Sequence, residues 1–161
     1  MKLIILDRDG VINHDSDQYI KSPEEWKPIA GSPEAIARLN QWGYRVVVAT
    51  NQSGVGRGLF EMDTLNAIHE KMIRTVAHAG GKIDAIFFCP HTHADACECR
   101  KPKAGMLDEI SARYNVDLAG VPAVAIPGGT HPDNGMPIGV QLMAAAGADG
   151  ELLRFAGSLQ G

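Results

Sequence analysis

The stretch KLIILDRDG, residues 2–10, decides the fold of this chain. It opens with a short apolar run of the kind that forms a buried β-strand. The run ends at Asp7, and a second carboxylate, Asp9, follows immediately before Gly10. A buried strand that ends in acidic side chains predicts an α/β protein, because such proteins bind ligands beyond the carboxyl ends of their strands.

Strand and helix patterns alternate after this turn. Apolar, β-branched or aromatic runs predict strands at 44–49 and 85–89, and apolar residues at helical spacing predict helices at 32–42, 63–76 and 106–114. Three such alternations favour the α/β class, with a Rossmann-like parallel sheet and helices on both faces. Asp7, Thr50 and Cys89 each stand at the end of a strand, so we expect them at one edge of the sheet.

The helix ends and faces follow from individual residues. Ser32 is a candidate cap, Pro33 suits the first helical position, and Gly43 ends that helix. Asp63 or Thr64 can cap the next one. Apolar residues at helical spacing are Ala35, Ile36, Leu39 and Trp42 in the first helix, and the residues expected on one face of the second are Leu65, Ile68, Met72, Ile73 and Val76.

The Asp7-x-Asp9 pair can divide the labour of catalysis. One carboxylate can act as a nucleophile while the other is a general acid and base, and together they offer oxygen ligands to Mg²⁺. An isolated pair of this kind is more often a solvated turn.

Two further segments could bind a phosphate. The Thr50 hydroxyl and the backbone amides of the glycine-rich loop at 50–58 can surround an anion, with Arg57 as an added donor. Arg100 and Lys101 add two cations before the last predicted helix, where a lysine could neutralise transition-state charge. The alternatives are an ordinary glycine-rich loop and a solvated basic turn.

All three cysteines lie between residues 89 and 99. Cys89, His91, Cys97 and Cys99 provide four nitrogen or sulfur ligands within eleven residues, as in a closed structural Zn²⁺ site. His93 is a rival ligand, and a loop of free thiols is the alternative. We do not expect a disulfide framework from three cysteines in a cytoplasmic chain.

Composition limits the class of protein. The 161 residues fit one domain, and 45% hydrophobic residues suffice for a packed core. The net charge of −4 gives no electrostatic footprint for nucleic acid. No apolar run approaches the ~20 residues of a membrane helix, and the first residues do not fit a secretory signal. We therefore expect a cytoplasmic protein, a monomer, with no nucleic-acid or membrane partner.

The chain resembles the haloacid-dehalogenase-like phosphatases over residues 1–124. The resemblance rests on LDRDGVIN (6–13), VATNQSGVGRG (48–58), the CPH and CEC groups, and CRKPKAGM (99–106). Within this family the chain most resembles the branch that removes the 7-phosphate of D-glycero-D-manno-heptose 1,7-bisphosphate during lipopolysaccharide core synthesis, and the zinc-type loop separates this branch and the histidinol-phosphate phosphatases from most of the family. The similar histidinol-phosphate phosphatases, and a catalytically weak, zinc-stabilised phosphosugar-binding domain, are the alternatives.

This resemblance implies a role for each matching residue. Asp7 would be the nucleophile and Asp9 the acid and base, with Asp7 and the Asp9 carbonyl holding Mg²⁺. Thr50 and Lys101 would hold and neutralise the transferring phosphoryl group. Cys89, His91, Cys97 and Cys99 would hold Zn²⁺. The substrate, a phosphorylated sugar, would contact Asp15, Ser16, Asp17, Gln18, Tyr19, Asn51, Gln52, Ser53 and Arg100.

The pattern breaks after residue 124. The family continues there with an acidic segment that supplies the remaining Mg²⁺ ligand, whereas this chain reads AIPGGT at 125–130 and has its next carboxylate at Asp133. Residues 118–161 resemble instead the C-terminal end of amidase-signature enzymes, without that family's catalytic residues. We therefore expect a phosphatase core at 1–124, an atypical segment at 125–161 that completes or follows the same domain, and impaired Mg²⁺ binding and turnover. Within this segment, 138–143 is a candidate strand and 151–159 a candidate helix.

Overall fold

A three-stranded parallel sheet forms the centre of the protein. The computed structural model describes residues 1–118, 123–130 and 137–143. Strands β1 (Lys2–Leu6), β2 (Tyr44–Asn51) and β3 (Ala85–Cys89) pair in that order. Leu6 lies opposite Val48, and Asn51 lies opposite Cys89. The strands therefore end at the same edge, as expected.

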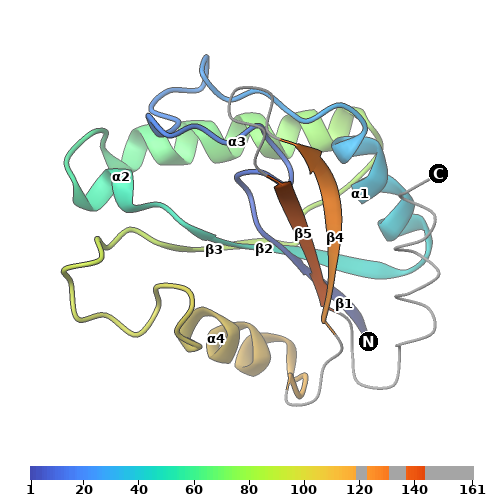
Figure 1. Cartoon of the computed structure of the whole chain (residues 1–161). Helices are drawn as coiled ribbons and strands as arrows, with labels where there is room; N and C mark the ends of the chain where they lie inside the picture. The colour runs from blue at the N-terminus through green and yellow to red at the C-terminus, as the bar shows by residue number, and fades with distance from the viewer. Residues whose placement is uncertain (119–122, 131–136, 144–161) are drawn as a thin grey trace.

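Helices cover both faces of this sheet (Figure 1). Helices α1 (Ser32–Gln41) and α3 (Met62–His78) pack on one face, and α4 (Gly105–Tyr114) packs on the other. The short α2 (Ser53–Gly56) follows β2 directly. Alternate residues of β1 enter the two cores, because side chains alternate across a strand: Ile4 packs with α1 and α3, and Ile5 packs with α4. The expected α/β class is confirmed.

Several predicted helix details are wrong. Ser32 does not cap α1 through its side chain; its hydroxyl donates to the Val11 carbonyl at 2.9 Å, and Gly31 stands at the cap position with a φ of 84°. Helix α3 begins at Met62, one residue before Asp63, and no side chain caps it. Ile73 is 42% exposed and so does not share the burial of the other residues on its predicted face, while Trp42, which follows α1 as its C-cap, is 51% exposed.

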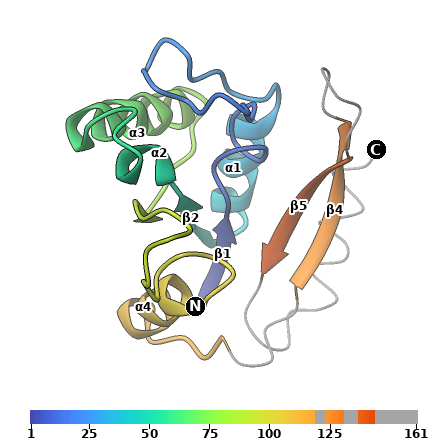
Figure 2. The same ribbon diagram turned by 60° about the vertical axis from the view of Figure 1, so that its left-hand side comes forward.

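The last two described strands form a separate antiparallel pair. They are β4 (Ala123–Thr130) and β5 (Pro137–Met143), and β5 lies close to β1 without joining the parallel sheet (Figure 2). The predicted strand at 138–143 is confirmed. The predicted helix at 151–159 and Asp133 lie outside the described residues.

The long loop between β1 and α1 is fastened to α3. Lys71 of α3 donates to the carbonyls of Pro23 and Trp26 at 2.6 and 3.0 Å, and the Trp26 side chain is fully buried. This anchoring holds the middle of the loop, residues 15–20, beside the carboxyl ends of the strands. No helix in the described part of the chain is long and apolar enough to cross a membrane.

Two isoleucines of α3 test this packing. Ile68 is fully buried and Ile73 is 42% exposed. We predict that Ile68→Ala lowers the free energy of unfolding by about 2–5 kcal/mol, because it leaves a cavity, whereas Ile73→Ala costs less than about 1 kcal/mol. Chemical denaturation of both variants measures the difference, and equal losses would contradict the packing of α3.

Candidate functional site

The acidic turn after β1 meets a lysine from the loop before α4. Lys101 Nζ donates to Asp7 Oδ2 at 2.6 Å and to the Ala49 carbonyl at 2.8 Å. The Asp7 side chain is 41% exposed, so one side of this ion pair faces solvent. A half-exposed carboxylate beside a fixed cation is open to an incoming electrophile and has a counter-charge for an anion that arrives with it.

Asn51 fixes the position of Lys101. Its side-chain amide donates to the Lys101 carbonyl at 3.1 Å and accepts from the Lys101 backbone N–H at 3.0 Å. These two hydrogen bonds fasten the loop before α4 to the end of β2. The Asn51 side chain was expected to contact substrate, but in the structure it hydrogen-bonds to the backbone of Lys101.

Asp9 is held from three directions. The guanidinium of Arg8 donates to both of its carboxylate oxygens, at 2.8 and 3.0 Å through one nitrogen. The Asn13 amide donates to Oδ1 at 2.9 Å, and the Gln52 amide donates to Oδ2 at 2.8 Å. Asp9 nevertheless lines the pocket described below. Its carboxylate is therefore fixed in orientation and still open to a molecule in the pocket.

Gln52 joins Asp9 to Thr50. The Gln52 side-chain nitrogen also donates to the Thr50 hydroxyl at 2.9 Å, and both residues are buried. With both protons of this nitrogen engaged inside the protein, the side-chain amide of Gln52 organises the site more than it reaches outward.

A pocket of about 220 Å³ opens at this edge of the sheet. Nine of the residues expected at the site line it, from the turn after β1, its following loop and the end of β2. They are Asp7, Asp9, Asp15, Ser16, Tyr19, Thr50, Asn51, Gln52 and Ser53. Arg8 and Ile20 line it as well. The structure therefore assembles residues that are more than forty positions apart in the chain.

Three expected substrate contacts lie elsewhere. Asp17 and Gln18 are exposed and do not line the pocket. The Arg100 side chain donates to the His91 carbonyl at 3.3 Å, which places it against the cysteine loop. Their contact with substrate stays a prediction, because a bound sugar could extend beyond the pocket walls.

Two residues near Asp9 were missed from the sequence. Arg8 is 1% exposed, and its guanidinium lies 3.4 Å from Nε2 of His69, on the buried face of α3. Burial, and then the charge of Arg8, lower the pKa of His69 to about 4. The position of His69 among Leu65, Ile68 and Met72 at helical spacing was the available signal, since a polar residue on an apolar face needs a partner.

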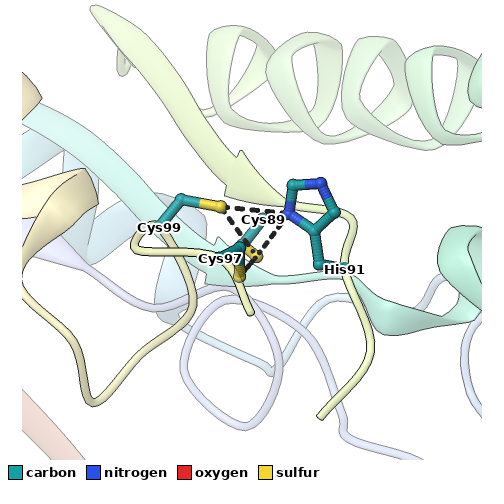
Figure 3. Close-up of side chains that lie close together, drawn as sticks. All are labelled: Cys89, His91, Cys97 and Cys99. Atoms are coloured by element: carbon teal, nitrogen blue, oxygen red, sulfur yellow. Dashed lines mark hydrogen bonds between the residues drawn. The ribbon is translucent and has the colours of Figure 1, made fainter. Parts of the chain in front are cut away.

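The four expected zinc ligands come together in one cluster (Figure 3). The candidate ligand atoms of Cys89, His91, Cys97 and Cys99 all lie within 4.8 Å of one another. His91 presents Nδ1 to the cysteines, whereas His93 is exposed and outside the cluster.

Two of the distances within the cluster match those between the ligands of a tetrahedral metal. Zn–S and Zn–N bonds of about 2.3 and 2.0 Å separate tetrahedral ligand atoms by about 3.5–3.8 Å. Cys89 Sγ lies 3.6 Å from His91 Nδ1 and 3.7 Å from Cys97 Sγ, while Cys99 Sγ is closer, 3.0 Å from Cys89 Sγ. Burial, followed by the contact with Cys99, raises the pKa of the Cys89 thiol to about 12. A metal cation is what holds such buried thiols as thiolates.

The cysteine loop is bonded directly to the pocket. The Gln52 backbone N–H donates to the Cys89 carbonyl at 2.7 Å, and the Gly56 N–H donates to the Pro90 carbonyl at 2.9 Å. A side chain at Gly56 would place its Cβ 2.5 Å from that carbonyl, so only glycine allows this approach. The cluster therefore fixes one wall of the site from outside the pocket.

Asp7 and Asp9 also suit Mg²⁺. In proteins this ion is usually held by one or two carboxylates, with water and substrate phosphate completing the octahedron. The Asp7 carboxylate lies in the pocket and meets the first requirement, and the Asp9 backbone carbonyl is the second ligand that the family resemblance implies, since both Asp9 carboxylate oxygens already accept hydrogen bonds. Strand β4 brings no third carboxylate, because residues 123–130 contain none. The residues fit a Mg²⁺ site that depends on the substrate for part of its coordination.

Known proteins match most of the chain. A family profile described as polynucleotide kinase 3 phosphatase matches residues 2–122. The D-glycero-beta-D-manno-heptose-1,7-bisphosphate 7-phosphatases of Bordetella bronchiseptica and Neisseria meningitidis are 64% and 59% identical over 124 and 119 residues. These matches cover 77% and 74% of this chain, and 69% and 64% of the relatives. The chain thus spans about two thirds of their length.

A solved structure shares the fold at high identity. The crystal structure of D,D-heptose 1,7-bisphosphate phosphatase from B. bronchiseptica, complexed with magnesium and phosphate, is 62% identical with a TM-score of 0.73. The match covers 74% of this chain and 67% of that one.

The two histidines of the cysteine loop test the metal cluster. We predict that the protein purified with Zn²⁺ carries about one ion per chain, and that His91→Ala reduces this stoichiometry strongly because a ligand is lost. His93→Ala is the matched control and should leave the zinc content unchanged. Elemental analysis after dialysis decides, and equal zinc in both variants would contradict the assignment of His91.

Proposed function

The chain belongs to the D-glycero-D-manno-heptose-1,7-bisphosphate 7-phosphatases of the haloacid-dehalogenase-like family, and on this premise we propose that it hydrolyses the 7-phosphate of that sugar. The observation that carries the proposal is the joint placement of Asp7, Asp9, Thr50 and Lys101 at one sheet edge, at positions where the motifs of the family match. The reaction would contribute to lipopolysaccharide core heptose synthesis in the cytoplasm, and we propose that the protein acts as a monomer.

The first step transfers the phosphoryl group to the protein. A carboxylate oxygen of Asp7 forms a bond to phosphorus while the bond from phosphorus to the sugar oxygen breaks. The protonated Asp9 carboxyl gives its proton to that oxygen, so the sugar leaves as an alcohol. Lys101, already 2.6 Å from Asp7, neutralises charge on the transferring group, and Thr50 donates a hydrogen bond to it.

The second step releases phosphate. The Asp9 carboxylate takes a proton from a water molecule, whose oxygen attacks the phosphorus of the aspartyl-phosphate. The bond between phosphorus and Asp7 breaks, so Asp7 is a carboxylate again and Asp9 is protonated for the next cycle. Mg²⁺ held by Asp7 and the Asp9 carbonyl would supply charge that offsets the repulsion between Asp7 and the phosphate.

We propose the remaining site roles on the same basis. Asp15, Ser16 and Tyr19 would contact the sugar from the pocket wall, while Asp17, Gln18 and Arg100 would contact parts of the substrate outside it. Ser53, buried at the start of α2, would add its backbone N–H to the phosphate site. Zn²⁺ in the cysteine loop would stabilise the pocket wall rather than enter the reaction.

Removing the nucleophile tests the proposed activity. We predict that Asp7→Asn lowers kcat on heptose 1,7-bisphosphate by ~10³-fold or more, because an amide cannot form the phosphoenzyme, while substrate affinity changes little. Glu70→Gln, which removes an exposed carboxylate of α3, is the control and should keep full activity. If Asp7→Asn and the wild type hydrolyse the substrate equally slowly, the protein is a binding domain and not an enzyme.

The missing acidic ligand predicts weak Mg²⁺ binding. Measured beside the B. bronchiseptica enzyme, this protein should need on the order of 10–100-fold more Mg²⁺ for half-maximal phosphate release, because the described strands 123–130 and 137–143 contain no carboxylate to serve as the remaining ligand. Titrating Mg²⁺ at saturating substrate measures this shift. Equal half-saturation would show that another group replaces the ligand and would overturn the expected impairment.

A further inference from the structure

Arg8 is a buried cation that contacts Asp9 on one side and His69 on the other. Its side chain is 1% exposed, which is unusual for arginine, and three of its contacts go to Asp9. This two-nitrogen grip fixes the plane of the Asp9 carboxylate, because a guanidinium is rigid and planar. The pocket is adjacent, so the grip acts on a group that is open to substrate.

His69 closes the far side of Arg8. Its Nε2 lies 3.4 Å from Arg8 Nη1, whereas the Asp9 contacts come from Arg8 Nε and Nη2, and its ring packs edge-on against Phe88 at 5.8 Å between centroids. The low pKa of His69 keeps this imidazole neutral at ordinary pH, so its unprotonated nitrogen can accept from Arg8. His69 thereby connects helix α3 to Arg8 and, through Arg8, to Asp9.

We propose that Arg8, held by His69, is a positioning residue that fixes the Asp9 carboxylate for proton transfer to the leaving sugar oxygen. The proposal rests on the proposed function, since it assigns Asp9 the role of acid and base. The alternative is that Arg8 only stabilises the fold, but a buried ion pair contributes little net stability compared with apolar residues of similar size. Arg8 binds the carboxylate of the proposed acid directly, and this favours a role in the reaction over a purely structural one.

A positioning role makes the loss depend on the leaving group. A sugar alkoxide must be protonated as it departs, whereas p-nitrophenolate leaves without a proton. Misplacing the Asp9 carboxyl should therefore slow release of the sugar and affect release of nitrophenolate much less. A general loss of folding would slow both alike.

Single-turnover rates with heptose 1,7-bisphosphate and p-nitrophenyl phosphate measure this difference. We expect Arg8→Met to slow sugar release by ~10²-fold, with KM nearly unchanged, and to slow nitrophenolate release by less than about tenfold. His69→Phe should show a smaller loss of the same kind, and His69→Gln, which keeps an accepting atom, should recover most of it. Arg74→Met, which removes an exposed arginine of α3, is the control.

Equal losses on the two substrates, or unchanged sugar release, would overturn the proposal. Arg8→Lys and His69→Gln keep the comparison available if Arg8→Met fails to fold. If the wild type releases neither product, the proposed function fails and the role of Arg8 in proton transfer fails with it, while solvent exchange of the Arg8 Nε–H measured by NMR separately tests whether His69 holds Arg8 against Asp9. Exchange should be at least about tenfold faster in His69→Phe than in the wild type, and equal exchange would overturn it.

Discussion

The parallel register of β1, β2 and β3 is the constraint on which the site depends. Because Leu6 pairs with Val48 and Asn51 pairs with Cys89, the turn after each strand opens at the same edge. This edge therefore brings together three groups that are far apart in the sequence: the candidate nucleophile Asp7, the Thr50 hydroxyl and the cysteine loop. A shift of one residue in either pairing would exchange the two faces of a strand and separate these groups.

The cysteine loop is hydrogen-bonded to the segment after β2 whose first residues line the pocket. Two backbone hydrogen bonds join it to Gln52 and Gly56, and Lys101 follows its last cysteine by two residues. Asn51 then clasps the backbone of Lys101, whose side chain reaches Asp7. A metal bound in this loop would therefore act on the proposed reaction through geometry, by fixing the Lys101 cation that faces Asp7, the proposed nucleophile.

The sequence predicts the parts of this arrangement that depend on local pattern. Alternating apolar runs placed the three parallel strands, and the spacing of Cys89, His91, Cys97 and Cys99 identified the cluster. Helix ends and exposure depend on tertiary packing, which is why the Ser32 cap and the burial of Ile73 were predicted wrongly. The Arg8–His69 contact joins residues 61 positions apart, so only the packing of α3 against the sheet reveals it. The sequence after residue 124 departs from the family pattern, and within its described part the strands β4 and β5 contain no carboxylate that could reach the site.

The central claim is that the first 124 residues still form an aspartyl-phosphate at Asp7. Acid quenching during turnover of heptose 1,7-bisphosphate, followed by borohydride reduction, converts an acyl phosphate to a homoserine residue that peptide mass spectrometry can locate. The account predicts homoserine at position 7 and at no other aspartate. Phosphate release without modification of Asp7 would contradict it.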